Sequence, residues 1–260
     1  MKNFNYILHH GLKNSSVLSC TSQNSTAEAH HFHSGIPGYA PTPLVSLPQL
    51  ASHLGVNRIY VKDESKRFGL NAFKALGGSY AIAKYLCSRL GIPVDEKAFN
   101  VLRSKEAKDK LGTVTFVTAT DGNHGRGVAW SARLLGHKAV VYMPEGSSTE
   151  RLENIRALGA EAEITPFNYD DAVRLAAKMA AKNGWVLVQD TAWPGYEEIP
   201  AWIMQGYTTM AQEIAAQLHE KDAALPTHLF LQAGVGSMAG AVLGYFASLW
   251  ADNPPITVIC

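Results

Sequence analysis

The stretch TVTFVTATDGNHGRGVAWSARLLG, residues 113–136, carries the pattern that decides the fold. Its first eight residues, 113–120, are rich in β-branched side chains, which pack well on a pleated surface and predict a strand. Residues 123–136 show the apolar spacing of a helix. A strand that passes through a short turn into a helix is the repeating unit of a parallel sheet covered by helices.

The same alternation continues on both sides of this stretch. Further strands are predicted at 58–64, 138–144, 162–166, 185–190, 227–232 and 255–260, and further helices at 74–91, 148–159, 169–184, 201–218 and 237–250. The sequence therefore predicts an α/β fold of two lobes, each a mostly parallel sheet covered by helices. We expect an irregular N-terminal segment at 1–40, a larger lobe formed by 41–110 and 191–260, and a smaller inserted lobe at 111–190.

Composition excludes several classes of protein. The chain has 260 residues, of which 47% are hydrophobic and 17% charged, with a net charge of +1, as expected for a folded globular protein. It has neither a basic block interleaved with aromatics, as in nucleic-acid binding, nor an apolar run near the roughly 20 residues that span a bilayer. Residues 1–16 lack the apolar run of a signal peptide, and the three cysteines are scattered, which favours the cytoplasm.

Two local features need an interpretation. Three histidines, His30, His31 and His33, lie within a polar stretch, and no carboxylate or cysteine partner lies close by. We interpret them as part of a solvated loop and predict no metal site, with a metal cluster as the less favoured alternative. The chain ends within the apolar run PPITVIC, residues 254–260, which predicts that it is C-terminally incomplete.

Lys74 is the first candidate for chemistry. It stands at a predicted helix start among the apolar residues Phe73, Ala75 and Leu76. A helix N-terminus and apolar neighbours both disfavour an ammonium ion, and they favour the neutral amine that can form a Schiff base. The alternative is an ordinary lysine whose ammonium lies in water.

Two glycine-containing turns are candidate anion sites. Glycines at 122, 125 and 127 follow a strand and open a helix, where free backbone amides could approach an anion. The stretch Gly234-Val235-Gly236-Ser237 also joins a strand to a helix and has the make-up of a phosphate cradle. A dinucleotide site is disfavoured because no acidic residue ends a following strand.

In their order along the chain, these three motifs resemble those of the fold-type II pyridoxal-phosphate enzymes, which include the serine and threonine dehydratases. Within that family the closest resemblance is to the ammonia-lyases, carried by NAFKALGGSYA (71–81), TATDGNHGRGVAW (118–130), VQDTAWPGYEEIP (188–200) and QAGVGSMAGA (232–241). The residue before Gly-Asn-His is usually small in the dehydratases, whereas here it is Asp121.

The resemblance implies a role for each motif. Lys74 would hold pyridoxal 5'-phosphate, Asn123 would bind its phenolic oxygen, and Gly234, Val235, Gly236 and Ser237 would bind its phosphate. Thr120, Asp121, Gly122 and His124 would receive the substrate carboxylate.

The implied reaction is an α,β-elimination that converts 2,3-diaminopropionate to pyruvate and two ammonia. Lys74 and Asp121 are candidate bases for opposite enantiomers, and Asp190 could hold the β-ammonium or be only a cap or surface carboxylate. A homodimer is also implied. The alternatives are a dehydratase-type enzyme and a non-catalytic fragment with an incomplete site.

Overall fold

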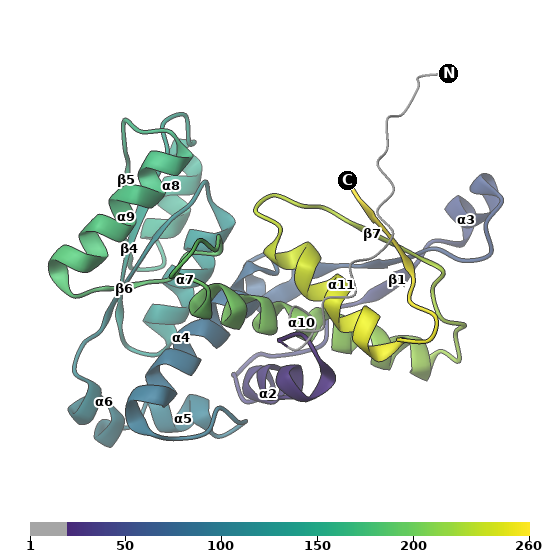
Figure 1. Cartoon of the computed structure of the whole chain (residues 1–260), viewed down its shortest axis with the longest axis horizontal. Coiled ribbons are helices and arrows are strands. Elements are labelled where there is room, and N and C mark those ends of the chain that lie inside the picture. The colour runs from purple at the N-terminus through teal and green to yellow at the C-terminus, as the bar shows by residue number, and fades with distance from the viewer. Residues whose placement is uncertain (1–19) are drawn as a thin grey trace.

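The computed structural model describes residues 20–260. Residues 1–19, which include the stretch searched for a signal peptide, lie outside the described residues. A four-stranded sheet with its helices lies at one end of the molecule, β7 (His228–Leu231) lies toward the other, and α10 (Glu198–Glu220) runs between them (Figure 1). In the described part of the chain, no helix is long and apolar enough to cross a membrane.

The four-stranded sheet is parallel throughout and has the order β5-β4-β3-β6. Its strands are β3 (Thr115–Ala119), β4 (Lys138–Met143), β5 (Glu161–Ile164) and β6 (Val186–Leu187), and its helices are α7 (Asn123–Leu134), α8 (Thr149–Arg156) and α9 (Tyr169–Asn183). Side chains alternate along the strands: Val117 packs with Ala176 of α9, whereas Phe116 belongs to the core that includes Val128 of α7. The predicted alternation of strand and helix is confirmed.

The remaining strands do not form the single second sheet that the sequence suggested. β2 (Tyr60–Lys62) pairs antiparallel with β1 (Leu44–Ser46), and β7 (His228–Leu231) pairs in parallel with β8 (Ile256–Ile259). The two pairs are separate sheets. The grouping of 58–64 with 227–232 and 255–260 was therefore wrong, because the partner of β2 is a short segment only 16 residues upstream of it that was not predicted as a strand.

Long helices form the centre of the molecule. They are α4 (Lys74–Leu90), α10 (Glu198–Glu220) and α11 (Ser237–Leu249). A Cβ on Gly127 would lie 2.8 Å from the Lys74 carbonyl oxygen, and one on Gly206 would lie 2.5 Å from that of Leu76. Glycine therefore allows α7 and α10 to approach the start of α4 more closely than any side chain would permit.

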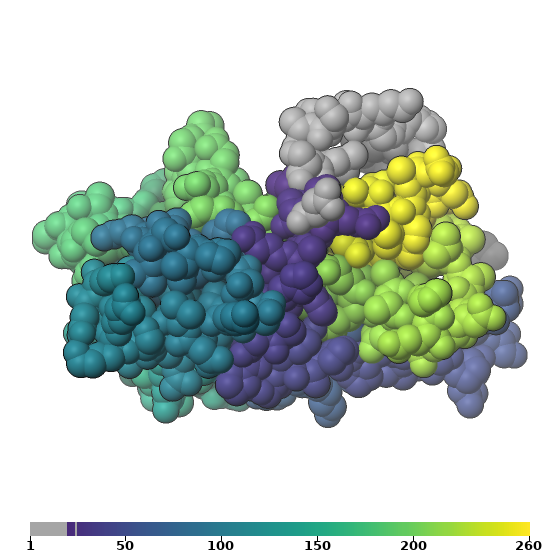
Figure 2. All heavy atoms as spheres, turned by 90° about the horizontal axis from the view of Figure 1, so that it is seen from below, coloured from purple at the N-terminus to yellow at the C-terminus, as the bar shows by residue number. Residues whose placement is uncertain are grey.

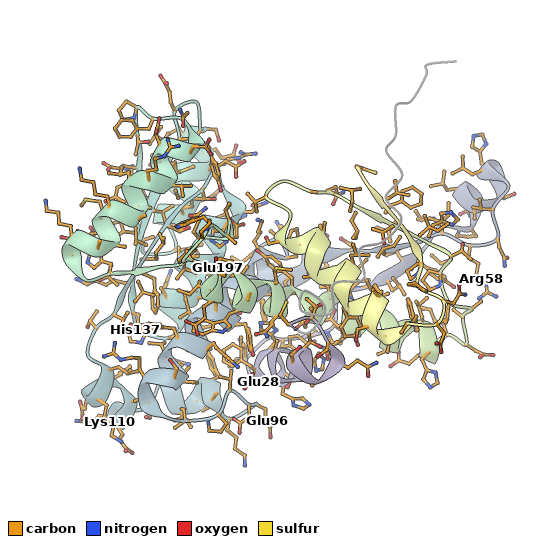
Figure 3. The ribbon with its side chains drawn as sticks, in the orientation of Figure 1. Glu28, Arg58, Glu96, Lys110, His137 and Glu197 are labelled. Carbon is orange, nitrogen blue, oxygen red and sulfur yellow. The ribbon has the colours of Figure 1, made fainter. Side chains whose placement is uncertain are left out.

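Helix α2 (Gln23–Ser34) corrects the prediction of an irregular segment at 1–40. Ser22 caps the helix by accepting a hydrogen bond from the Ser25 amide at 3.4 Å, and Phe32 is fully buried. Figure 2 shows residues 20–40, in purple, lying across the middle of the molecule. Glu28, labelled in Figure 3, lies on this helix and forms an ion pair with Lys84 of α4. The segment is thus part of the core.

The three histidines lie on α2 and not in a loop. His33 is fully buried: its Nδ1 lies 2.8 Å from Thr209 Oγ1 and its Nε2 lies 3.0 Å from the Leu76 carbonyl oxygen. Burial lowers the pKa of His33 to about 3. The interpretation of His33 as solvated was wrong, because this face of α2 packs on the core. Within residues 20–260, no group of three or more His, Cys, Asp or Glu could hold a metal ion.

Short elements complete the described chain. They are α3 (Pro48–Leu54), the 3₁₀ segment η1 (Glu64–Gly69), α5 (Ala98–Leu102) and α6 (Lys105–Leu111). Arg67 of η1 is buried and pairs with Glu213 of α10 at 2.8 Å, which ties the chain that precedes Lys74 to the long central helix.

Candidate active site

The candidate motifs meet at one cleft of about 480 Å³. It lies where α4 and α7 begin, after the end of β6, and beside the loop that precedes α11. Of the predicted residues, the cleft is lined by Lys74, Thr120, Asp121, Asn123, His124, Asp190, Gly234, Val235, Gly236 and Ser237. Gly122 is buried and is not part of the lining. Segments separated by more than 100 residues along the chain therefore converge as expected.

Lys74 is the first residue of α4, as predicted. Its Nζ lies 5.9 Å from the ring centroid of Phe73 and 6.0 Å from that of Tyr207. The same Nζ forms an ion pair with Asp190, whose side chain is 3% exposed. Lys74 Nζ therefore has a buried carboxylate beside it as well as two aromatic rings.

Asp190 is held at the end of β6 by hydrogen bonds to the residues before it. The Tyr196 hydroxyl donates to the Leu187 carbonyl oxygen at 2.9 Å and accepts from the Gln189 amide at 2.8 Å. Burial tends to raise the pKa of Asp190, but the nearby His124 and Lys74 outweigh it, and the pKa lies below its usual value. Asp190 is therefore a buried, ionised partner of Lys74, and the alternative that it is only a surface carboxylate is wrong.

His124 is a buried part of the cleft lining. Its Nε2 lies 2.8 Å from the Val188 carbonyl oxygen, and its Nδ1 lies 3.6 Å from Asp190 Oδ2. Burial lowers the pKa of His124, and the charge of Lys74 lowers it further, while Asp190 acts in the opposite direction. Both ring nitrogens thus point at residues 188–190, and the side chain does not present a free donor to a substrate carboxylate.

The turn between β3 and α7 is closed by Thr120, whose Oγ1 accepts a hydrogen bond from the Gly122 amide at 3.0 Å. Asp121 is exposed at the rim of the cleft, and Arg151 of α8 donates to its carbonyl oxygen at 3.1 Å. The Arg151 guanidinium also lies 3.8 Å from the Asp121 carboxylate. Arg151 thereby offsets part of the repulsion that Asp121 would exert on an anionic substrate.

The glycines of this turn serve packing more than anion binding. A Cβ on Gly125 would lie 2.4 Å from Thr120 Cγ2, and one on Gly127 would contact the Lys74 backbone. We predicted that Gly125 and Gly127 free the backbone for an anion, but these contacts give each glycine a steric reason of its own. Gly127 thereby lets the starts of α4 and α7 come together, whereas Gly125 lets α7 pack on its own sheet.

Residues 234–237 fit a phosphate group. Gly236 adopts φ of 91°, in the left-handed region that favours glycine, and it directs the chain into α11. The Ser237 hydroxyl is buried, faces the cleft and has no hydrogen-bond partner. Because the first amides of a helix also lack intrahelical acceptors, this loop offers several unused donors to an anion.

Sequence reasoning missed several lining residues, which include Pro144, Arg151, Tyr169, Gln232 and Met238. Tyr169 opens α9, and its hydroxyl accepts a hydrogen bond from Gln189 Nε2 at 3.0 Å. No local motif marks Arg151 or Tyr169, which reach the cleft only because the parallel sheet places the ends of its strands along one edge. That topological rule was the only signal that could have found them.

Comparison with known proteins agrees with this geometry. Residues 36–260 match the model of a family described as "Pyridoxal-phosphate dependent enzyme". The chain is 58% identical over 243 residues to a diaminopropionate ammonia-lyase of Salmonella typhimurium, an alignment that covers 94% of this chain and 60% of the relative. It is 53% identical to a diaminopropionate ammonia-lyase of Escherichia coli, with 89% and 57% covered.

A solved structure is similar over most of the chain. The Escherichia coli diaminopropionate ammonia-lyase in complex with an aminoacrylate-PLP azomethine reaction intermediate superimposes with a TM-score of 0.84 at 50% identity, over 92% of this chain and 60% of that one. This chain therefore spans about 60% of the length of the curated relatives it matches.

Proposed function

Because this chain belongs to the family of pyridoxal-phosphate dependent enzymes, we propose that its cleft binds pyridoxal 5'-phosphate and serves the elimination of ammonia from 2,3-diaminopropionate. The observation that carries the proposal is the convergence of Lys74 with the 234–237 loop on one cleft. The substrate is taken from the two relatives above, which are diaminopropionate ammonia-lyases at 58% and 53% identity.

Different residues of the cleft would bind different parts of the cofactor. Lys74 would bind its aldehyde carbon, and Asn123 would donate to its phenolic oxygen. Gly234, Val235, Gly236 and Ser237 would bind its phosphate, which gives the unpartnered Ser237 hydroxyl an acceptor. The bound pyridine ring withdraws electrons and so makes the proton on the substrate Cα removable.

The other residues would bind substrate and move protons. The backbone of Thr120 to His124 would hold the substrate carboxylate, with Arg151 as a nearby cation. Lys74 and Asp121 would each take the Cα proton of one enantiomer, from opposite faces. Loss of the β-amino group, followed by hydrolysis, would give pyruvate and two ammonia.

Asp190 would act through Lys74. It is buried beside Nζ and is ionised, so it can orient the amine and accept a charge-assisted hydrogen bond from it. Binding of the substrate β-ammonium by the same carboxylate would require Lys74 to release it. Asp121, at the rim and 77% exposed, is better placed to meet an incoming ammonium.

We propose three further features of the whole enzyme. The smaller lobe would comprise 111–190, and the larger lobe would comprise 41–110 and 191–260. A homodimer rests on the family resemblance alone. A cytoplasmic location rests on the scattered cysteines.

Labelling tests the central assignment. Reduction of the chain with borohydride in the presence of pyridoxal phosphate, followed by peptide mapping, is expected to place the pyridoxyl group on Lys74. Lys74→Arg keeps the positive charge but replaces the primary amine with a guanidinium, which does not form a Schiff base. The pyridoxyl label at that peptide is therefore expected to disappear. A label that lands on another lysine would contradict the assignment.

The substrate is tested separately. Ammonia release is measured from D- and L-2,3-diaminopropionate and from D- and L-serine, under identical conditions. We expect faster release from diaminopropionate, because Asp121 at the rim can attract its β-ammonium, which serine lacks. Faster release from serine would favour the dehydratase-type alternative. Labelling of Lys74 without turnover of either substrate would favour the non-catalytic alternative.

A further inference from the structure

The buried His124 ring has one nitrogen whose proton is fixed by the fold. A backbone carbonyl only accepts hydrogen bonds, so at 2.8 Å from the Val188 carbonyl oxygen the His124 Nε2 must carry the hydrogen. The neutral ring then has a lone pair on Nδ1, which lies 3.6 Å from Asp190 Oδ2. Nδ1 is buried and has no hydrogen-bond partner.

A lone pair directed at a carboxylate is unfavourable, and protonation of Nδ1 would reverse the sign of the contact. The His124 and Asp190 side chains are only 4% and 3% exposed, so water screens them little. Asp190 already has a cation partner in Lys74. Two cations around one buried carboxylate repel each other, so a charged Lys74 favours the neutral form of His124.

The phenols around this cluster keep a constant charge. Tyr207 of α10 and Tyr169 of α9 both feel the charge of Asp190, and burial raises the pKa of each phenol, so both stay neutral. Asp121 lies on the exposed rim and Arg151 lies beside it. The charge inside the site therefore depends on Lys74, Asp190 and His124.

We propose that His124 and Lys74 are alternating cation partners of Asp190, so that His124 takes up a proton at Nδ1 when the Lys74 nitrogen loses its charge. His124 is thus a positioning residue that keeps Asp190 ionised and in place while Lys74 is engaged elsewhere. This role of the His124 side chain is separate from the binding of the substrate carboxylate by the backbone of the 120–124 turn.

The event that removes the charge rests on the proposed function. Lys74 can take the proton of a substrate Cα only as a neutral amine, so its ammonium must first give up one proton. His124 Nδ1 is the buried acceptor that this cluster provides for a proton, and Asp190 stabilises the imidazolium that results.

The experiment removes the charge without any cofactor. In the whole chain, histidine ring signals are titrated by NMR in the wild type and in Lys74→Met, and the His124 signal is assigned by its loss in His124→Gln. We expect the His124 protonation constant to rise at least tenfold in Lys74→Met. Lys110→Met is the control, because this lysine lies on α6, away from the cleft, and it is expected to change nothing (Figure 3).

A second variant tests the pair from the other side. Asp190→Asn keeps the shape of the side chain and removes its charge, so the His124 protonation constant is expected to fall at least tenfold. It also provides a measurement if Lys74→Met does not fold. An unchanged or lower constant in folded Lys74→Met, or an unchanged constant in folded Asp190→Asn, would overturn the proposal.

This titration does not depend on whether Lys74 binds the cofactor. If borohydride labelling misses Lys74 but the His124 constant responds to both substitutions, the cofactor assignment fails and the pairing holds. If labelling succeeds and the constant does not respond, the pairing fails and the cofactor assignment holds.

Discussion

The backbone at residue 236 requires glycine, whereas the backbone two residues earlier does not. Gly236 has φ of 91°, and Gly234 lies outside the left-handed region, with no atom within 4 Å of a Cβ built on it. A β-branched residue in the left-handed region costs roughly 1–2 kcal/mol, which the loop can avoid only by changing its path. The two glycines therefore differ in how strictly they fix the phosphate loop.

Replacement of these glycines tests the loop. Gly236→Val is expected to weaken binding of pyridoxal phosphate by well over tenfold, or at least about 1.4 kcal/mol, because the donors of the loop no longer converge. Gly234→Ala is the matched control and is expected to bind almost normally. Affinity is measured by absorbance titration, with circular dichroism to show that each variant is folded. Unchanged affinity in folded Gly236→Val would refute the phosphate assignment.

Asp121 is the residue that separates this chain from the dehydratase pattern, and Arg151 supplies the compensating charge that the sequence alone did not identify. In Asp121→Asn the shape is kept and the basicity is removed. Turnover of one enantiomer of 2,3-diaminopropionate is expected to fall roughly 10²- to 10⁴-fold, the usual effect of a positioned base, with little loss for the other. The measurement is kcat for each enantiomer, and equal losses for both would instead indicate substrate binding.

For single residues, the sequence predicted where the motif residues lie, but it did not predict which distant side chains they contact. The position of Lys74 at a helix start and the 234–237 loop could be identified because each is a local pattern. The pairing of Lys74 with Asp190 joins residues 116 positions apart, and the contact of Arg151 with Asp121 joins residues 30 apart. Such pairs depend on how strands are ordered in the sheet, which no single motif encodes.

Among the elements, the contact of α4 with α7 sets the geometry of the cleft. Gly127→Ala would place a Cβ 2.8 Å from the Lys74 carbonyl oxygen, and backbone cannot yield as a side chain can. We expect it to lower the free energy of unfolding by about 1–3 kcal/mol, the usual cost of overpacking. It should also weaken pyridoxal-phosphate binding, because the start of α4 must move. Urea unfolding and absorbance titration measure the two effects.

A second helical glycine serves as the control. A Cβ on Gly240 of α11 would meet only the terminal methyl group of Met204, at 3.1 Å, and a methionine end can move aside. Gly240→Ala is therefore expected to change stability by less than about 1 kcal/mol, since a small clash is offset by better helix propensity. An equal loss in both variants would show that close helix contact at Gly127 has no special role.

The strands and helices of the four-stranded sheet could be predicted because their periodicity is strong. Helix α2 could not be predicted in this way, because its sequence is mostly polar and its apolar stripe, which includes Ala29 and Phe32, is narrow. The helix is stabilised by tertiary packing of that stripe. Strand β1 escaped prediction for a related reason: it has three residues, too few to show a period of two, so its pairing with β2 was missed as well.

Considered as a whole, the molecule is held together by buried polar contacts as well as by apolar packing. Arg67, Glu213 and Lys62 form a buried charge network between η1, α10 and β2. Through its ring nitrogens, His33 links α2 to α10 and to α4. Such groups make stability depend on pH, because their protonation differs between the folded and the unfolded chain.

His33 is expected to make the free energy of unfolding depend steeply on pH. Its pKa is about 3 in the folded chain and 6.5 when unperturbed, so below pH 6.5 the unfolded chain binds a proton that the folded chain does not. The stability that neutral His33 contributes is therefore present above pH 6.5 and is lost as the pH falls toward 3. The expected slope from this one residue is about 1.4 kcal/mol per pH unit.

The contribution of His33 can be isolated between pH 6.5 and 4.5. Glu213 adds a loss of its own only below about 4.5, because its pKa is lowered to about 2 in the folded chain, where Arg67 and Lys62 overcome the effect of burial. Replacing His33 with glutamine, which does not titrate, is expected to reduce the pH slope of the unfolding free energy by about 1.4 kcal/mol per unit in this window. His31→Gln, on the exposed face of the same helix, is the control. Urea denaturation at half-unit steps measures the slopes, and an equal slope in all three proteins would mean that His33 is not buried in solution.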